Sequence, residues 1–107
     1  MEVFLKGRGL RITAAMRNRT ETKLAKLGRI DPRVTRVEVE VILERNPRID
    51  GSHRVDVACA RGPRVIRAHA AGQDLDGALD QVIERLERRL TSRREKLRDR
   101  RHSGPMV

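Results

Sequence analysis

Basic residues on two amphipathic segments carry the clearest chemical signal in this chain. Between residues 74 and 101, apolar residues recur every three or four positions, which predicts one buried stripe along a helix. At about 100° per residue, Arg85, Arg89 and Lys96 share one flank of that stripe. The other flank is acidic and contains Asp76, Asp80, Glu84 and Glu87. Because guanidinium and ammonium groups bind phosphate oxygens, this sorting of charge favours contact with a polyanion.

An earlier segment, residues 13–27, repeats the same division. Arg19, Lys23 and Lys26 share one flank of its apolar stripe, and Glu21 lies opposite. Because each helix has basic residues on one flank and acidic residues on the other, the sequence predicts that the two helices form one basic surface. The alternative is a solvated face with pairing inside each helix, and on that interpretation Arg88 pairs with Glu84 four residues earlier.

Composition narrows the class of partner. The chain has 107 residues, a formal net charge of +10 and a pI near 11.4, which favour nucleic acid over an anionic membrane surface. A basic protein with no dedicated partner is the remaining interpretation. Phe4 is the only aromatic residue, so modules that stack bases on several aromatic rings are disfavoured. We therefore expect binding mostly through charge and shape.

Catalytic and metal-binding patterns are weak. Strand alternation places Cys59 and His69 on opposite faces of a sheet, so they should not converge with His53 on a metal. Ser52 and His53 lack a third residue to orient them. Asp56 forms a cross-strand charge pattern with Arg54 and Arg67 on an open sheet, which is not a catalytic cleft. The sequence thus predicts no enzyme, cofactor, metal or small-molecule substrate. Without a leader, an apolar span or a second cysteine, it predicts a cytoplasmic protein that does not enter a membrane.

The elements that position these residues follow the order β-α-β-β-β-α. Thr13 is expected to cap the first helix and Gly28 to end it, while Asp74 caps the second helix. Residues 45–53 read as a loop, and Gly62-Pro63 as a turn. The strands alternate apolar and polar residues, so we expect an α+β fold with a four-stranded sheet and both helices packed on one face. Residues 1–97 form one domain, and residues 98–107 form a basic, disordered tail.

Both helices resemble those of the ribosome hibernation promoting factor family, also called ribosome-associated inhibitors. The first helix matches in Leu10-Arg11-Ile12-Thr13, Met16-Arg17 and Lys23-Leu24-Ala25-Lys26-Leu27. The second matches in Gln73-Asp74-Leu75, Ala78-Leu79 and Leu86-Glu87-Arg88-Arg89-Leu90. The sequence departs from the family at Asp76, where an aromatic residue is usual. The chain is similar to a short-form member or to the N-terminal domain of a longer one.

The resemblance implies a non-enzymatic factor that occupies the mRNA and tRNA channel of the small ribosomal subunit. Such a factor contacts 16S rRNA and keeps idle ribosomes silent. Separately from the resemblance, we expect the chain to be a monomer. Carried over residue by residue, RNA contact falls on Lys23, Lys26, Arg85, Arg88 and Arg89, and less strongly on Arg17, Arg29 and Lys96. Arg19 joins them through its position on the first basic flank. A general double-stranded-RNA module is the alternative, although such modules order their elements α-β-β-β-α.

Overall fold

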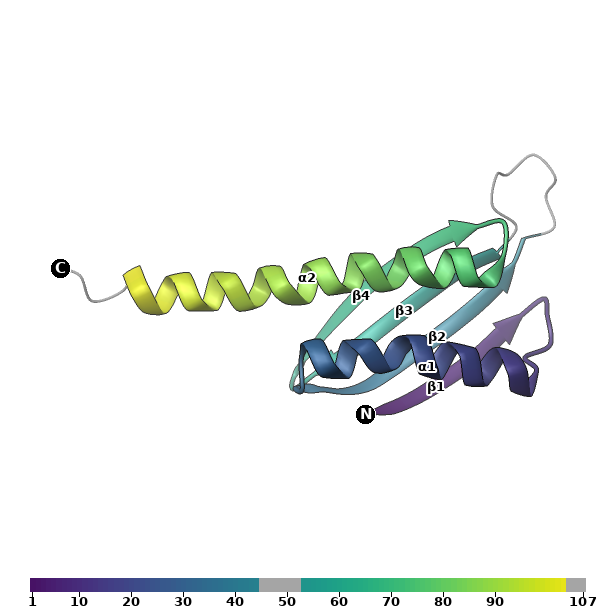
Figure 1. Ribbon diagram of the computed structural model, residues 1–107, viewed down its shortest axis with the longest axis horizontal. Helices are drawn as coiled ribbons and strands as arrows, with labels where there is room; N and C mark the ends of the chain where they lie inside the picture. The colour runs from purple at the N-terminus through teal and green to yellow at the C-terminus, as the bar shows by residue number, and fades with distance from the viewer. Residues whose placement is uncertain (45–52, 104–107) are drawn as a thin grey trace.

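The computed structural model describes the backbone of residues 1–44 and 53–103, and side chains as far as Thr91. Its six elements confirm the predicted order (Figure 1). The strands are β1 (Glu2–Arg8), β2 (Val34–Leu43), β3 (His53–Arg61) and β4 (Arg64–Gly72), and the helices are α1 (Ala14–Ile30) and α2 (Leu75–Ser103). The loop expected at residues 45–53 lies outside the described residues, except for His53, which begins β3.

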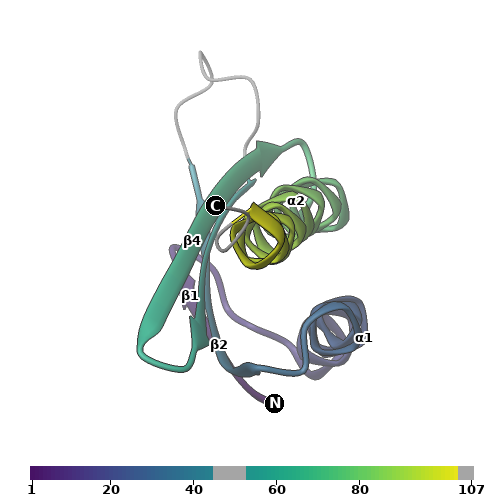
Figure 2. The ribbon, with the colours of Figure 1, turned by 90° about the vertical axis from the view of Figure 1, so that its left-hand side faces the viewer.

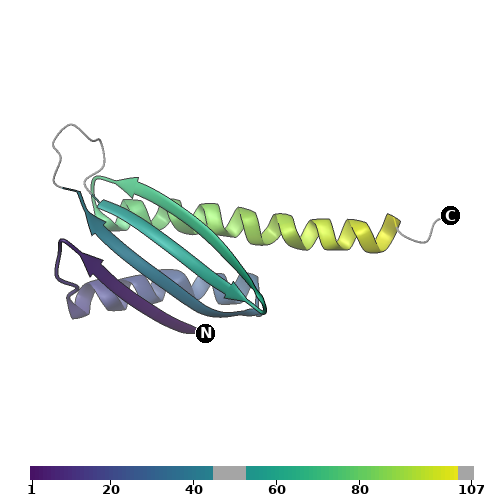
Figure 3. The same ribbon diagram turned by 180° about the vertical axis from the view of Figure 1, so that it is seen from behind.

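The four strands form one sheet in the order β1-β2-β3-β4. Strand β1 pairs with β2 in parallel, and the other two pairings are antiparallel. Both helices lie on the same side of the sheet, as Figure 2 shows end-on. From behind, all four strands are seen in front of the helices, so the second face of the sheet has no helical cover (Figure 3). The predicted α+β architecture is confirmed.

The core lies between the sheet and the helices because each strand presents one apolar face. Val37, Val39 and Val41 of β2 are almost completely buried, and so is Cys59 of β3. Helix α2 covers them with one apolar stripe, whose fully buried members include Leu79, Val82, Leu86 and Leu90. A strand period of two and a helix period of 3.6 thus determine the two sides of the core.

Side chains cap the start of each helix as the sequence predicts. The Thr13 hydroxyl accepts a hydrogen bond from the Met16 amide at 3.1 Å, and an Asp74 carboxylate oxygen accepts one from the Gly77 amide at 2.7 Å. The predicted end of α1 at Gly28 is wrong. The helix continues to Ile30, and the Asp31 backbone N–H donates to the Leu27 carbonyl. An extended Asp31 ends the helix without the left-handed glycine that we expected.

Helix α2 extends past the predicted end of apolar periodicity at Leu97 and continues to Ser103. Figure 1 shows that this last part projects beyond the sheet. Backbone hydrogen bonding along a helix does not need an apolar stripe, which explains why the pattern in the sequence stops earlier than the helix. The division into a domain at 1–97 and a disordered tail at 98–107 stays a prediction.

A buried ion pair joins the turn after α1 to the end of β3. Nε of Arg61 lies 2.7 Å from Oδ2 of Asp31, and their side chains are 8% and 3% exposed. The distance is that of an ion pair, although the two groups are not aligned as a hydrogen bond. Removing one partner would leave a buried charge without compensation, so this pair fixes the turn between α1 and β2.

Candidate nucleic-acid interface

The basic flank of α1 faces the acidic flank of α2. The two helices run side by side in the same direction (Figure 1), and three ion pairs bridge them. We call these pairs the interhelix ladder: Arg19–Asp76 at 3.1 Å, Lys23–Asp80 at 2.6 Å and Lys26–Glu87 at 3.2 Å. All six side chains retain solvent contact, so each pair contributes less than about 1 kcal/mol to stability.

The ladder corrects the expectation of one continuous basic surface. Arg19, Lys23 and Lys26 do lie on one flank of α1, as predicted. That flank, however, meets the carboxylates of α2 and not its arginines. The departure noted at Asp76 contributes to this arrangement, because its carboxylate is the partner of Arg19. In the free protein, the charges of these three α1 residues are balanced within the fold.

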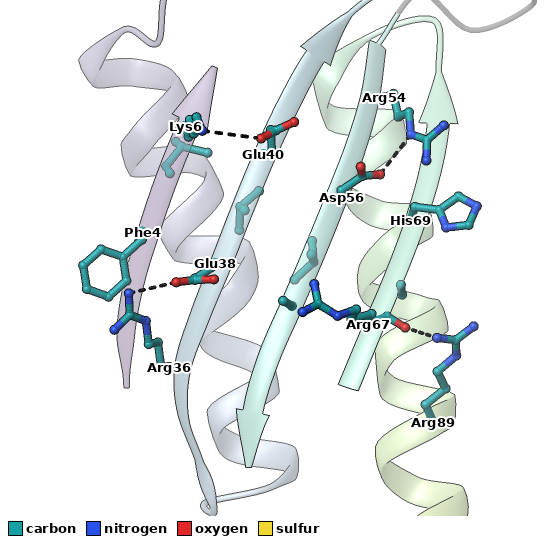
Figure 4. Close-up of a pocket in the computed structure, with 15 residues that line it drawn as sticks. Phe4, Lys6, Arg36, Glu38, Glu40, Arg54, Asp56, Arg67, His69 and Arg89 are labelled. Atoms are coloured by element: carbon teal, nitrogen blue, oxygen red, sulfur yellow. Dashed lines mark hydrogen bonds and ion pairs between the residues drawn. The ribbon is translucent and has the colours of Figure 1, made fainter. Parts of the chain in front are cut away.

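The opposite flank of α2 reaches the free edge of β4. Arg85 donates a hydrogen bond to the backbone carbonyl of His69, and Arg89 donates to that of Arg67. Figure 4 shows the Arg89 contact on the side of β4 away from β3. A carbonyl holds a guanidinium group in place without cancelling its charge. These two arginines therefore keep their positive charge at the surface.

Strand β4 itself carries two exposed arginines. Arg64 and Arg67 have exposed side chains, and neither forms an ion pair within the described part of the chain. We call Arg64, Arg67, Arg85 and Arg89 the β4–α2 edge. Sequence reasoning assigned Arg67 to a charge pattern and overlooked Arg64. The alternation of Arg67 with the buried Ile66 and Ala68 indicated its outward position, but not its proximity to α2.

The remaining predicted contact residues lie elsewhere. Arg88 forms an ion pair with Glu84, as the alternative interpretation of the sequence proposed. Arg29 is exposed beside a groove of about 560 Å³ between the helices, which Lys26 and Glu87 also line. The side chain of Lys96 is outside the described residues, although its backbone belongs to α2. Thus only Arg85 and Arg89 of the predicted set lie at the β4–α2 edge.

The uncovered face of the sheet contains a hollow of about 790 Å³ (Figure 4). Its acidic residues are paired with neighbouring cations: Glu38 with Arg36 at 2.8 Å, Glu40 with Arg8 at 3.2 Å and Asp56 with Arg54 at 2.9 Å. The hydrogen bond from Arg54 to Asp56 raises the pKa of the arginine above its ordinary value. Arg67 and Arg89 from the β4–α2 edge line the same hollow.

Other chemistry is not supported by the described residues. Burial raises the pKa of the Cys59 thiol to about 11, so it is protonated at neutral pH and is a poor nucleophile. His69 points away from Cys59 on the exposed face. No cluster of three or more His, Cys, Asp or Glu side chains in the described ranges could hold a metal ion. No described helix is long and apolar enough to cross a membrane.

Sequence comparison identifies the class of protein that this fold and charged edge belong to. Residues 3–98 match the family described as sigma 54 modulation protein / S30EA ribosomal protein, and the chain belongs to that family. The ribosome hibernation promoting factor of Salmonella typhimurium is 33% identical over 98 residues, which cover 92% of this chain and 98% of that protein. The resemblance drawn from the two helix motifs is confirmed.

A longer relative and two solved structures extend the comparison. The ribosome hibernation promotion factor of Mycobacterium tuberculosis is 38% identical over 105 residues, which cover 96% of this chain but 47% of that protein. The N-terminal domain of Thermus thermophilus Protein Y matches with a TM-score of 0.72 and 28% identity, covering 84% of this chain and 96% of that domain. A ribosomal subunit interface protein from Coxiella burnetii shares the fold, with a TM-score of 0.75, 21% identity and coverage of 89% and 99%.

Proposed function

We propose that this chain is a ribosome hibernation factor that binds the small ribosomal subunit without catalysing a reaction. It occupies the channel for mRNA and tRNA, contacts 16S rRNA and keeps idle ribosomes silent in the cytoplasm. Membership of the family supports ribosome association. The observation that carries the RNA assignment is the β4–α2 edge, where Arg85 and Arg89 of α2 are held by backbone carbonyls of β4 and none of its arginines is paired with a carboxylate in the described part of the chain.

The β4–α2 edge supplies the first contacts in this mechanism. Arg85 and Arg89 are held by carbonyls and keep donors and charge available for phosphate oxygens. Arg64 and Arg67 add two exposed positive charges on β4. If each of these four arginines neutralises one phosphate, the logarithm of affinity falls with the logarithm of salt concentration with a slope of about −3 to −4. Structured rRNA is then recognised by the placement of its phosphates.

The α1 cations act second in the same mechanism. Lys23 and Lys26 reach a phosphate only when it replaces Asp80 and Glu87 as their partner. Exposed ion pairs of this kind exchange at little cost, because each contributes less than about 1 kcal/mol. RNA binding on this side of the protein therefore breaks the ladder and leaves the carboxylates of α2 solvated.

Co-sedimentation with vacant ribosomes and separated subunits tests this proposal. We expect saturable, near-stoichiometric binding to the small subunit, with loss of binding when mRNA and tRNA are added as competitors. A salt series measures the slope given above. Diffuse binding that plain duplex RNA removes equally well would contradict the proposal and favour a general double-stranded-RNA module.

A further inference from the structure

The hollow on the uncovered face of the sheet is lined by long side chains and by the small side chain of an alanine. Its floor includes Ala58 of β3, which is the register partner of Glu38 on β2 and of Arg67 on β4. Ala58 has only a methyl group, and the Arg67 side chain extends from β4 across β3 in the direction of Arg36 (Figure 4). The hollow is thus an open trough that crosses the strands, with a small apolar floor and guanidinium groups on both sides.

The aromatic ring of Phe4 lies at the β1 end of this trough. Phe4 is 44% exposed, whereas its strand neighbours Val3 and Leu5 point towards the core. The Arg36 guanidinium lies 4.2 Å from the centroid of the ring. The guanidinium lies over the ring and covers one of its faces, and both side chains of this stacked pair stay about half exposed, so the pair still offers a flat surface to an unpaired base. The only aromatic residue of the chain therefore lies in the one environment suited to stacking that we find among the described residues.

The charge of the trough is concentrated at the opposite end. Five cationic side chains and three carboxylates line it, and each carboxylate is paired with a cation on the same face. Arg67 of β4 and Arg89 of α2 are the lining cations without a carboxylate partner in the described ranges. This end therefore attracts an anion, while at the Phe4 end the charge of Arg36 is balanced by its ion pair with Glu38.

We propose that this face binds a short single-stranded RNA segment. One unpaired base stacks on Phe4 and Arg36, and neighbouring phosphates lie against Arg67 and Arg89. The inference rests on the proposed function, because Arg67 and Arg89 also belong to the β4–α2 edge. The RNA path then continues from α2, around the edge of β4 and across the uncovered face of the sheet. Three strand spacings, about 14 Å, separate the backbones of β1 and β4 and set the length of the path.

Fluorescence anisotropy with two RNA probes tests the inference on the full chain. One probe is a ten-nucleotide single strand without self-complementarity, and the other is a hairpin duplex. We expect Phe4→Ala to weaken binding of the single strand about tenfold and to leave the duplex within twofold, since stacking on an aromatic ring requires an unpaired base. Arg67→Gln should weaken both probes about threefold or more, because phosphates are common to both.

Matched variants keep the result interpretable. Arg33→Gln removes one exposed positive charge in the turn before β2, away from the trough, and should leave both probes within twofold. Phe4→Leu retains an apolar side chain if the alanine variant unfolds, and should still lose the preference for the single strand. Circular dichroism checks that each variant is folded. Equal effects of Phe4→Ala on both probes, or no effect on either, would overturn the inference.

Ribosome binding separates this inference from the proposed function. If the parent chain fails to co-sediment with ribosomes but Phe4→Ala still weakens the single strand selectively, the proposed function fails and the stacking site stands. If Phe4→Ala weakens ribosome binding and leaves both RNA probes unchanged, the face docks a ribosomal protein and the RNA assignment is wrong. Amide NMR signals of Phe4, Ala58 and Arg67 should shift when the single strand is added, and unshifted signals would also overturn the inference.

Discussion

The basic flank of α1 and the β4–α2 edge both consist of basic residues but have different electrostatic roles. On α1, Arg19, Lys23 and Lys26 each face a carboxylate of α2. At the β4–α2 edge, Arg85 and Arg89 face neutral backbone carbonyls. Both arrangements orient the cation, but only the second leaves its charge uncompensated. A basic residue is therefore available for RNA according to what faces it, and not only according to its own helix.

This difference sets the order of events on a polyanion. Uncompensated charge acts over roughly a Debye length, about 8 Å at physiological salt, whereas a neutralised pair has little field at that distance. The β4–α2 edge should therefore guide the encounter and supply most of the affinity. The α1 flank should contribute only after close contact, when phosphates compete with the carboxylates.

The largest effect is expected from reversing charge at the edge. Arg85→Glu combined with Arg89→Glu should weaken binding to the small subunit at least a hundredfold, because two phosphate contacts become repulsions. Co-sedimentation measures the loss, and circular dichroism should remain native. Arg85→Lys with Arg89→Lys preserves the charge and should bind within about tenfold of the parent. Undiminished binding of the glutamate variant would exclude the β4–α2 edge as the main contact with the small subunit.

A charge swap across the ladder should separate stability from binding. Lys23→Glu places two carboxylates opposite each other and should lower the free energy of unfolding by about 1 kcal/mol, measured with urea. Adding Asp80→Lys restores an ion pair of reversed polarity and should recover most of that loss. Binding should fall about threefold to tenfold in Lys23→Glu. If the swap fails to recover stability, Lys23 and Asp80 are not coupled as the structure places them.

Removing a ladder carboxylate should strengthen binding. Asp80→Asn frees Lys23 from its partner, so we expect affinity for the small subunit to rise about threefold. Glu21→Gln is the matched control, since it removes one exposed negative charge from α1 without touching the ladder. The same rise in both variants would reflect net charge alone. No rise in Asp80→Asn would show that Lys23 does not meet a phosphate.

Cys59 provides the smallest expected effect on binding, because it lies in the core away from both regions. Cys59→Ala should leave affinity within twofold.

Burial raises the pKa of the Cys59 thiol to about 11 from an ordinary value of 9.0, so the unfolded chain loses this proton at lower pH than the folded chain. The contribution is fully present below about pH 9 and is lost as the pH rises towards 11. Urea titrations should show this alkaline decline in the parent and less of it in Cys59→Ala.

Sequence patterns predicted the secondary structure of each segment better than the contacts between segments. Thr13 and Asp74 cap their helices because capping depends on residues three positions away at most. The alternation of Val37, Val39 and Val41 likewise predicted the buried face of β2. These local rules were sufficient for the order of elements and for the sheet with both helices on one face.

The candidate site was harder to predict because it depends on the rotation of α2 about its own axis. That rotation turns Asp80 towards α1 and Arg85 towards β4, and helical periodicity alone does not determine it. The contacts of Arg85 and Arg89 with β4 require the strand and the docking of α2 together. The prediction that α1 ends at Gly28 was wrong for a different reason. Asp31 is extended and donates its backbone N–H to the Leu27 carbonyl, so the helix ends there without a glycine. RNA contact by Lys96 stays a prediction.

The hydrogen bonds from Arg85 and Arg89 also affect self-association. Strand β4 is at the edge of the sheet, and an open edge invites pairing with a strand from another molecule. Two guanidinium groups occupy carbonyls that such a strand would need, and their charge repels a second copy of this basic chain. The residues that we propose to bind RNA therefore also discourage aggregation. Loss of these arginines would affect solubility at high protein concentration as well as RNA affinity.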